Sequence, residues 1–595
     1  MRRLAAIVLV AAAAVVSITI LAVRSHKQAP QYVFLICLDA VRPDHLGCYG
    51  YGAGTSPAID ALAGEGFVFE DAVSQAPWTT PSIATILTST FPSQHGARRT
   101  EGSRVPYSGV ASSFVETLGN LGFQTALFTG GIAIKDKVPG SELVASSLKW
   151  LKQNLGSKCC IVIHDYETHG PYIAAPSCVE ELDPGYKGPF KLRFGEMEVL
   201  RKARVGRLSE VLNLSGADLK HIKALYDCQI IDADAAVGAL VDSLAAWDRL
   251  DRSMIMVFSD HGEEFLEHGS IDHGQTVYEE SIRVPLVIFC PSLGMKPVRI
   301  KEQVGLIDLA PTIFDALRIE KPAAFEGISL LPLMSRRSKV VRETVRPCGI
   351  PAGCLVAESI ARRSEKKALR CPPWKLIYDP FYGSGELYDI SADPGETLNL
   401  IDERPDVASM LTDTLLVMRK FYPGGWCIAW RGEPSTSAEV KGRIDVDANL
   451  IEAVPHDFFP GVDAETDSVV TADDWRSVRF VTPVAPGWKG IEIRMEGPAR
   501  ATADVRFLRR GSGAARPFAP VAAIGEAGAT VTLPAILNPE DARVERANLR
   551  DVFEDAERNG RQCVIFWTDP GSEPTARARK ETELRQQLKA IGYVD

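Results

Sequence analysis

Two acidic residues follow apolar runs that are far apart in the chain. Asp39 comes directly after Tyr32–Leu38, and Asp260 with His261 ends the run Met254–Ser259. Apolar runs of this length are typical of buried parallel strands. Ligands of open α/β sheets bind at the carboxyl ends of the strands. Because carboxylates and imidazoles bind divalent cations, we expect Asp39, Asp260 and His261 to form a metal site.

A segment rich in threonine and proline lies between these two runs. Ser82 follows Pro81 and could simply start a helix. Alternatively, Thr79 lies at the amino end of that helix, where backbone N–H groups favour an anion. A metal ion could then lower the pKa of the Thr79 hydroxyl and make it a nucleophile. On spacing alone, the helix-start interpretation of this segment is the stronger one.

Histidines gather in the same part of the chain. The sequence has 10 histidines, and three of them, His261, His268 and His273, lie within a short segment. His169 follows another apolar run, Cys160–His164. Histidines at strand ends suit proton transfer and the stabilisation of developing negative charge. We therefore consider His169 and His273 as candidate catalytic residues.

Apolar strand-like runs alternate with amphipathic stretches from about residue 31 to 400. Further expected strands are Gln124–Thr129 and Val284–Cys290, and expected helices are Ser82–Leu87, Ala111–Leu118 and Leu219–Leu244. Such alternation predicts an α/β fold with a mainly parallel sheet and helices on both faces. Residues 172–218 break the pattern, and we expect an insertion there that could cover the site.

The pattern of the sequence changes near residue 430. Short apolar or alternating runs separated by turn residues follow, at Val469–Thr471, Val478–Val481, Ile491–Met495, Ala503–Phe507 and Thr530–Leu533. This pattern is typical of a small antiparallel β-sandwich. We therefore expect four parts: a membrane anchor or signal segment at 1–28, a catalytic domain at 29–425, a β-rich domain at 430–575 and a helix within 576–595.

The N-terminal segment predicts export. Leu4 to Val23 carries no charge and matches the ~20 residues that span a bilayer as a helix. A signal peptide has a shorter apolar region and a small-residue cleavage site, so we favour an uncleaved anchor. The catalytic domain would then lie outside the cytoplasm, periplasmic or extracellular, and a cleaved segment would give a secreted protein. The net charge of −10 gives no reason to expect a nucleic-acid partner.

The 12 cysteines divide into two groups. Cys37 and Cys290 lie in expected core strands and are predicted to be buried thiols. An exported protein could form disulfides among the others. Those near irregular segments are Cys159, Cys160, Cys178, Cys348, Cys354 and Cys371. Their pairing cannot be deduced from the sequence.

Residues 31–400 resemble the sulfatase family of the alkaline phosphatase superfamily. The resemblance rests on many short motifs that occur in the family's order. They are Asp39–Gly47, Thr79–Ile83, Pro92–Gly96, His169–Tyr172, Ser259–Glu263, Glu267–Gly269, Arg283–Leu286, Asp308–Thr312, Lys375–Asp379, Glu386–Asp389 and Asp393–Glu396, with Ile591–Tyr593 at the end. The resemblance implies an alkaline phosphatase-like α/β domain followed by the small β-sandwich.

The resemblance also implies roles for single residues. Asp39, Thr79, Asp260 and His261 would hold one divalent metal ion, Mn²⁺, Mg²⁺ or Ca²⁺. Thr79 would be the nucleophile. The remaining roles would be catalytic for His169 and His273, and substrate binding for His268 and Arg98. This set is similar to that of single-metal threonine enzymes of the superfamily, such as lipoteichoic acid synthases and phosphoethanolamine transferases.

Three departures from the family bear on the chemistry. Thr79 stands where the family has the cysteine that becomes formylglycine, Ile83 replaces the paired arginine, and Ala40 replaces the second aspartate. A formylglycine hydrate can release sulfate by elimination, and a threonine ester cannot. A threonine phosphoryl ester can be resolved by water or by an acceptor alcohol. The threonine therefore favours phosphate esters over sulfate esters.

These observations lead to one expected function and two alternatives. We expect a membrane-anchored, exported, metal-dependent hydrolase or transferase that acts through Thr79 on a phosphate or sulfate ester, such as a lipid- or glycan-linked one. The first alternative is a true sulfuric-ester hydrolase with a nucleophile other than formylglycine. The second is a catalytically silent binding protein displayed on the membrane, which Ala40 and Ile83 would permit.

Overall fold

The structure is a computed structural model of the chain. It describes residues 28–95, 97, 113–130, 138–194, 214–337, 344–347, 350–358, 366–378 and 385–417, and, as backbone alone, the strands at 99–100, 103–104 and between 425 and 568.

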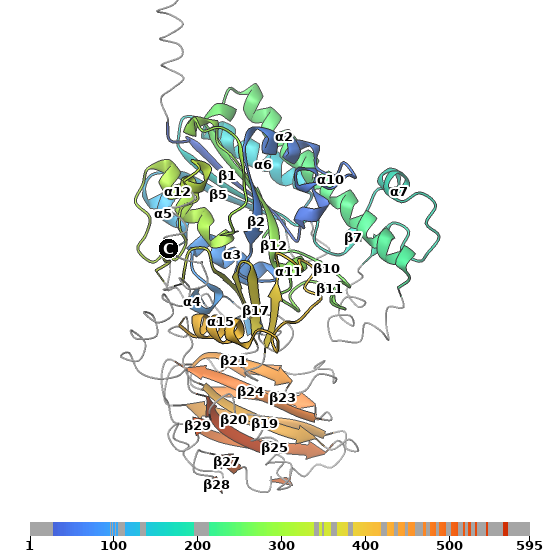
Figure 1. The fold of residues 1–595 in the computed structure, drawn as a ribbon, viewed down its shortest axis with the longest axis vertical. Helices are drawn as coiled ribbons and strands as arrows, with labels where there is room; N and C mark the ends of the chain where they lie inside the picture. The colour runs from blue at the N-terminus through green and yellow to red at the C-terminus, as the bar shows by residue number, and fades with distance from the viewer. Residues whose placement is uncertain are drawn as a thin grey trace, which may run out of the picture.

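An eight-stranded sheet forms the centre of the N-terminal part (Figure 1). Its strands run in the order β13-β2-β12-β9-β1-β6-β5, and β14 pairs with β2. Their bounds are β1 Tyr32–Leu38, β2 Phe67–Val73, β5 Gln124–Thr129, β6 Cys159–Asp165, β9 Ser253–Phe258, β12 Arg283–Phe289, β13 Val298–Ile300 and β14 Val304–Gly305. Strand β1 pairs in parallel with β6 and β9, whereas β12 is antiparallel to both of its neighbours. The predicted mainly parallel sheet is confirmed.

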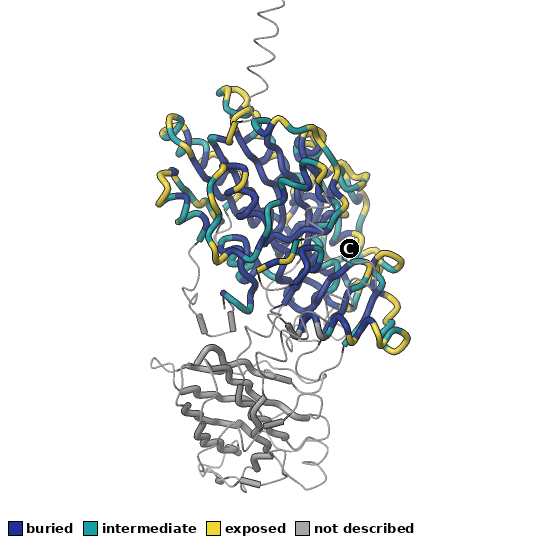
Figure 2. The backbone as a smooth tube through the Cα atoms, turned by 60° about the vertical axis from the view of Figure 1, so that its left-hand side comes forward, coloured by how far each residue is buried: buried dark blue, intermediate teal, exposed yellow. Residues whose placement is uncertain are grey.

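Helices cover both faces of this sheet (Figure 1). One face packs against α2 (Pro57–Glu65), α6 (Gly140–Gln153) and α10 (Gly216–Ala246), and the other against α3 (Thr79–Thr88), α5 (Phe114–Asn120) and α12 (Leu309–Leu317). Side chains of a strand alternate between faces, so Phe34 and Ile36 of β1 join one core and Val33 and Leu35 join the other. Every residue of β1 is buried. Figure 2 shows buried backbone through the middle of this part of the chain and exposed backbone at its edges.

The start of α3 corrects one sequence expectation. The helix begins at Thr79, after Trp78, and Ser82 lies inside its first turn. Ser82 therefore does not cap the helix, because its hydroxyl donates to the backbone oxygen of Asp260 instead. The long helix α10 does have a side-chain cap, since Ser215 and Asp218 form a capping box.

Smaller elements surround the main sheet. A four-stranded antiparallel sheet packs against α15 (Pro405–Val417), and two short hairpins follow β6 and β9. The strands are β15 Leu355–Ala357, β16 Lys367–Cys371, β17 Trp374–Tyr378, β18 Gly385–Asp389, β7 Tyr172–Ile173, β8 Arg193–Phe194, β10 Glu264–Phe265 and β11 Ile271–Asp272; the short helices are α4 Pro92–His95, α7 Pro176–Leu182, α11 Glu279–Ile282 and α13 Leu331–Met334. The expected insertion at 172–218 contains β7, α7 and β8, and its residues 195–213 lie outside the described ones.

The C-terminal strands form two further sheets. One has the order β21-β24-β19-β30-β27-β28, with β29 beside β30, and the other has the order β22-β23-β20-β25-β26. The longer strands are β19 Gly425–Gly432, β20 Ala438–Val446, β21 Leu450–Asp457, β22 Ser468–Thr471, β23 Ser477–Pro483, β24 Gly487–Met495, β25 Ala501–Arg509 and β30 Cys563–Thr568. The shorter ones are β26 Arg516–Pro517, β27 Ala522–Ile524, β28 Thr530–Val531 and β29 Arg543–Val544. Their pairing is mostly antiparallel, which confirms the small antiparallel domain, although β30 has parallel partners in β27 and β29. The helix expected at Ala576–Ile591 lies outside the described residues.

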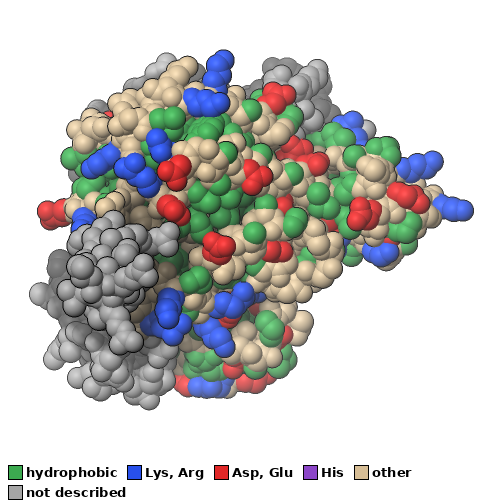
Figure 3. Space-filling model, turned by 90° about the horizontal axis from the view of Figure 1, so that it is seen from above, with side chains coloured by type: hydrophobic (Ala, Val, Ile, Leu, Met, Phe, Trp, Pro, Cys, Tyr) green, Lys and Arg blue, Asp and Glu red, His purple; other side chains and the backbone are tan. Residues whose placement is uncertain are grey.

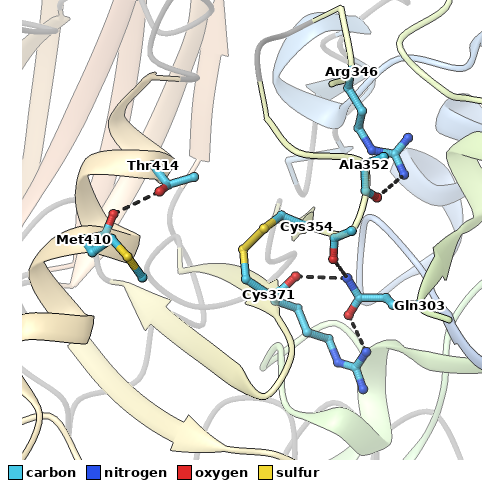
Figure 4. The surroundings of a disulfide bond; sticks show 9 residues. Gln303, Arg346, Ala352, Cys354, Cys371, Met410 and Thr414 are labelled. Atoms are coloured by element: carbon cyan, nitrogen blue, oxygen red, sulfur yellow. Dashed lines mark hydrogen bonds between the residues drawn. A yellow bond between two sulfur atoms is a disulfide. The ribbon is translucent and has the colours of Figure 1, made fainter. Parts of the chain in front are cut away.

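Two disulfides link described segments. Cys178 in α7 pairs with Cys228 in α10, and Cys354 pairs with Cys371 in the four-stranded sheet. Figure 4 shows the second one, beside Gln303, whose amide donates to backbone oxygens on both sides of it. The free cysteines among the described residues are Cys37, Cys48, Cys159, Cys160 and Cys290.

These thiols settle most of the expectations for the cysteines. Cys37 and Cys290 are buried thiols, as predicted. Some of the cysteines near irregular segments do form disulfides, namely Cys178, Cys354 and Cys371. Cys159 and Cys160 are buried thiols at the start of β6. Cys348 lies outside the described residues.

Two further features are the distribution of charge on the surface and the apolar N-terminal segment. On the face in Figure 3, acidic and basic side chains alternate rather than gather into one patch. Within the part of the chain that the structure describes, no helix has the length and apolarity to cross a membrane. The expected anchor at Leu4–Val23 lies outside that part, so it stays a prediction.

Candidate active site

The carboxyl ends of β1 and β9 bring two aspartates together. The strands pair in parallel with Cys37 opposite Phe258, so residues just beyond them meet at one edge of the sheet. Asp39, Asp260 and His261 are fully buried there. His261 Nε2 lies 3.7 Å from Asp39 Oδ1 and 3.6 Å from Asp260 Oδ2.

Thr79 completes this cluster from the first turn of α3. Its Oγ1 donates to Asp39 Oδ2 at 3.3 Å and lies 3.2 Å from His261 Nε2. Ser82, one turn later, donates to the backbone oxygen of Asp260 at 2.7 Å. This bond ties α3 to the loop after β9 and holds the amino end of the helix against the carboxylates.

Backbone contacts fix the loop that carries the metal-binding candidates. The Ser259 hydroxyl accepts from Val41 N at 2.8 Å and donates to the backbone oxygen of His261 at 2.7 Å. His261 Nδ1 donates to the carbonyl oxygen of Gly262 at 2.9 Å. Because Nδ1 carries the proton, Nε2 is left as the ligand atom and points to the carboxylates.

The cluster fits a divalent metal ion. Asp39 Oδ1 and Asp260 Oδ2 are buried, and neither has a hydrogen-bond partner among the described residues. Burial and then repulsion by Asp39 raise the pKa of Asp260. Burial opposes ionisation of Asp39 as well, but His169 and other nearby histidines lower its pKa. Two buried carboxylates that face each other require a compensating cation, and oxygen and imidazole ligands suit a divalent one.

Two more histidines lie beside this cluster. The ring of His273 is 4.3 Å from that of His261 and 5.0 Å from that of His169, measured between centroids. His273 Nδ1 lies 3.2 Å from Glu263 Oε1 and 3.0 Å from Asp272 Oδ1. His169 Nδ1 donates to the carbonyl oxygen of Gly170 at 2.5 Å. The structure therefore brings both catalytic candidates next to the metal candidates.

Their environments give these two histidines different charges. Burial alone would lower the pKa of His273, but the carboxylates of Asp272 and Glu263 raise it to about 10. Burial lowers the pKa of His169 to about 4. Near neutral pH, His273 is then a cation and His169 is a neutral imidazole.

The two expected substrate-binding residues are not brought into this cluster. His268 Nδ1 donates to Glu280 Oε1 at 2.6 Å, and its ring stacks on Tyr278 at 3.7 Å. Its Nε2 lies 3.3 Å from the backbone oxygen of Glu396, so this ring belongs to a different network. Arg98 lies outside the described residues.

Two residues near the site received no role from the sequence. Tyr172 donates from its hydroxyl to Glu263 Oε2 at 2.7 Å, and so supports the carboxylate that holds His273. His164, at the end of β6, places Nε2 3.3 Å from Asp39 Oδ2. The sequence could have identified His164 because it ends an apolar run, as Asp39 follows one.

Comparison with known families agrees with this geometry. Residues 31–319 match the profile described as "Sulfatase". This part of the chain is therefore similar to the sulfatase family. Residues 266–420 also match the profile of the C-terminal region of N-sulphoglucosamine sulphohydrolase. The sulfatase match covers β1, α3 and β9, which are the elements that carry the candidate site.

Curated relatives of the chain include arylsulfatase K from several vertebrates. The chicken protein (Gallus gallus) is 32% identical over 216 residues, which are 35% of this chain and 38% of that protein. The human protein (Homo sapiens) is 31% identical over 209 residues, 33% of this chain and 37% of that protein. The chain thus matches little more than a third of these relatives' length.

Solved structures share the fold of about two thirds of the chain. The phosphonate monoester hydrolase of Agrobacterium radiobacter aligns with a TM-score of 0.53 and 18% identity, over 66% of this chain and 95% of that one. A protein solved in complex with its substrate D-glucosamine-2-N,6-O-disulfate aligns with a TM-score of 0.52 and 18% identity, over 66% of this chain and 99% of that one. These similarities establish an alkaline phosphatase-like fold.

Proposed function

We propose that this chain is a metal-dependent ester hydrolase in which the Thr79 hydroxyl is the nucleophile. The observation that carries the proposal is the place of Thr79 Oγ1, 3.3 Å from Asp39 Oδ2 and 3.2 Å from His261 Nε2 at the amino end of α3. A hydroxyl held between metal-binding side chains can be activated, whereas one that only caps a helix bonds to the backbone.

The metal ligands in this proposal are Asp39, Thr79, Asp260 and His261. The unpartnered oxygens of the two aspartates support this assignment. When bound, a divalent cation would lower the pKa of the Thr79 hydroxyl and offset negative charge on the ester. The first N–H groups of α3 lack partners inside the helix and favour an anionic ester at the same place.

The remaining steps fall to this chain's own side chains. Thr79 Oγ1 forms a bond to the phosphorus or sulfur atom as the bond to the leaving oxygen breaks. His273, cationic beside Glu263 and Asp272, stabilises the charge that builds on the equatorial oxygens. His169, as a neutral imidazole, takes the proton that Thr79 Oγ1 loses and gives it to the leaving oxygen. In the second step it takes a proton from the water that attacks the phosphorus or sulfur atom and returns it to Thr79 Oγ1, and its bond to Gly170 orients the ring for both transfers.

Two ester classes are candidates for the substrate. A threonine ester of phosphate can be hydrolysed by in-line attack of water on phosphorus, so the residue at position 79 favours phosphate or phosphonate esters. The similarity to arylsulfatase K favours sulfate esters. Both classes present a tetrahedral anion with one ester oxygen, which the same set of residues can bind.

The test of the nucleophile uses two adjacent threonines. Thr79→Ala should lower kcat/KM about a thousandfold or more, since a nucleophile acts on the reacting atom itself. Thr80→Ala, the neighbouring position in α3, should keep activity near that of the wild type. The assay compares aryl phosphate, phosphodiester, phosphonate and sulfate esters with added Mn²⁺, Zn²⁺, Mg²⁺ or Ca²⁺. Full activity of Thr79→Ala on the preferred ester would refute the assignment.

We also propose that the catalytic domain works outside the cytoplasm. The disulfides Cys178–Cys228 and Cys354–Cys371 support an oxidising compartment. The uncharged stretch from Leu4 to Val23 supports export and attachment to a membrane. In that location a lipid- or glycan-linked ester is the natural substrate class.

A further inference from the structure

His164 stands beside the metal candidates without an assigned role. In β6 it lies opposite Cys37 of β1, and Asp39 comes two residues after Cys37. Side chains of paired residues share a face, and so do residues two apart in a strand. His164 therefore faces the same side of the sheet as Asp39, which is the side that α3 covers. Its side chain is only 6% exposed.

The imidazole of His164 is aimed at both aspartates. Nε2 lies 3.3 Å from Asp39 Oδ2 and 3.8 Å from Asp260 Oδ2. The contact with Asp39 is close enough for an ion pair, but this nitrogen has no acceptor among the described residues that meets the geometry of a hydrogen bond. A buried ring nitrogen without a hydrogen bond is destabilising, and a bound metal ion would give it a partner.

His164 and the two aspartates each have a buried side-chain atom without a hydrogen-bond partner among the described residues. These atoms are His164 Nε2, Asp39 Oδ1 and Asp260 Oδ2. A hydrogen-bonded proton could satisfy one pair of them, but a cation can accept lone pairs from all three. The residue after Asp39 is Ala40, which offers no ligand atom, so the sheet edge has room in its ligand set for one more donor.

The separations between these atoms also suit one metal ion. Ligand atoms about 2.0–2.2 Å from a metal lie roughly 3–3.5 Å from their neighbours in the coordination shell. His164 Nε2 to Asp39 Oδ2 is 3.3 Å, close to the 3.2 Å between Thr79 Oγ1 and His261 Nε2. We propose that His164 is an additional ligand of this metal, through Nε2.

A second imidazole changes which metal the site prefers. Carboxylates and water suit Mg²⁺ and Ca²⁺, whereas imidazoles favour Zn²⁺ and other transition metals. With His164 and His261 both bound, the site selects a metal of the Zn²⁺ type over Mg²⁺ and Ca²⁺. This inference rests on the proposed function, because it takes the metal site of that proposal as given.

The test counts the imidazoles that bind the metal. Full-length protein, labelled with ¹⁵N-histidine and loaded with Mn²⁺, is examined by pulsed electron paramagnetic resonance. We expect two directly coordinated histidine nitrogens in the wild type and one in His164→Ala. His221→Gln is the matched control, because His221 is a buried histidine bonded to Asp183 in another part of the fold, and it should keep two.

A second readout measures metal preference. Competition with a chelator should show tighter binding of Zn²⁺ than of Ca²⁺, and His164→Ala should reduce that preference about tenfold or more. If His164→Ala does not fold, His164→Gln takes its place. The number of histidine nitrogens coordinated to Mn²⁺ in the wild type still tests the proposal without any variant.

Each outcome bears on a different claim. One coordinated imidazole in the wild type, or two in His164→Ala, would overturn the inference and leave the proposed function standing. In those cases His164 would only position the carboxylate of Asp39. A wild type that binds no stoichiometric metal would overturn the proposed function and this inference with it.

Discussion

At the scale of single residues, Tyr172 holds the carboxylate of Glu263, which pairs with His273 beside the metal candidates. Its hydroxyl donates to Glu263, whose other oxygen lies 3.2 Å from His273 Nδ1. Supporting residues of this kind typically change activity 10–100-fold when they are lost. The effect should appear in kcat more than in KM, because His273 stabilises charge that develops during the reaction.

The corresponding prediction is that Tyr172→Phe lowers kcat about tenfold. Tyr51→Phe is the matched control, because Tyr51 also donates to a buried carboxylate, that of Asp227, at 2.6 Å. Steady-state kinetics of both variants provide the measurement. Equal losses in the two variants would mean that a general effect on stability explains the result.

At the scale of elements, α11 is bound to the four-stranded sheet through a buried ionic cluster. Glu279 accepts from Arg370 Nη2 at 2.9 Å and from Lys375 Nζ at 3.0 Å. Lys375 also pairs with Glu396 at 2.7 Å. Burial disfavours the charge of Glu279, but Arg370 and Lys375 outweigh it and lower the pKa of Glu279 to about 2.

This pKa predicts how stability depends on pH. The ordinary value for a glutamate is about 4.5, so the charged form of Glu279 stabilises the fold fully above that pH. The stabilisation is lost as pH falls from about 4.5 towards 2. Its size is up to about 3 kcal/mol, from the lowered pKa.

Urea unfolding of wild type and Glu279→Gln between pH 7 and pH 2.5 tests this. The variant should be less stable at neutral pH, and the difference in unfolding free energy should shrink as the pH falls below about 4.5. Glu142→Gln, on the exposed side of α6, should match the wild type throughout. A difference that stays constant with pH would contradict the ionic account.

The positions of the strands were easier to predict than the direction in which the strands pair. The run Tyr32–Leu38 and the run Gln124–Thr129 coincide with β1 and β5, because every second or every residue is apolar over a strand's length. The antiparallel direction of β12 could not be predicted, since its apolar run looks the same in either direction. The disulfide Cys178–Cys228 could not be predicted either, because its cysteines are 50 residues apart and one of them lies inside α10.

Within the site, the sequence identified residues at loop tips more readily than those inside strands. Asp39, Asp260 and His261 follow apolar runs and stand out as polar residues. His164 also ends such a run, but its meaning depends on β6 lying next to β1, which only the pairing reveals. His268 lies close to His273 in the sequence and was expected to bind substrate, yet its contact with Glu280 holds it in another network.

At the scale of the whole molecule, the N-terminal segment and the catalytic domain should be separable. Deleting residues 1–28 should move the protein from the membrane fraction to the soluble fraction and leave kcat/KM on a small ester unchanged. The candidate site lies in elements from β1 onward, so it does not need that segment. Fractionation, followed by activity assays of both forms, is the measurement. A deletion variant that stays with the membrane would point to attachment through another part of the chain.

The central claim is that Thr79 forms a covalent ester with the substrate's phosphoryl or sulfuryl group. The most direct measurement is peptide mass spectrometry of the full-length enzyme, quenched in acid during turnover of its preferred ester. We expect a phosphoryl or sulfuryl adduct on Thr79. Fragment ions that contain Thr80 without Thr79 should carry no adduct, and Thr79→Ala should carry none at either position. An adduct on a different residue, or rapid turnover with Thr79 unmodified at every quench time, would contradict this claim.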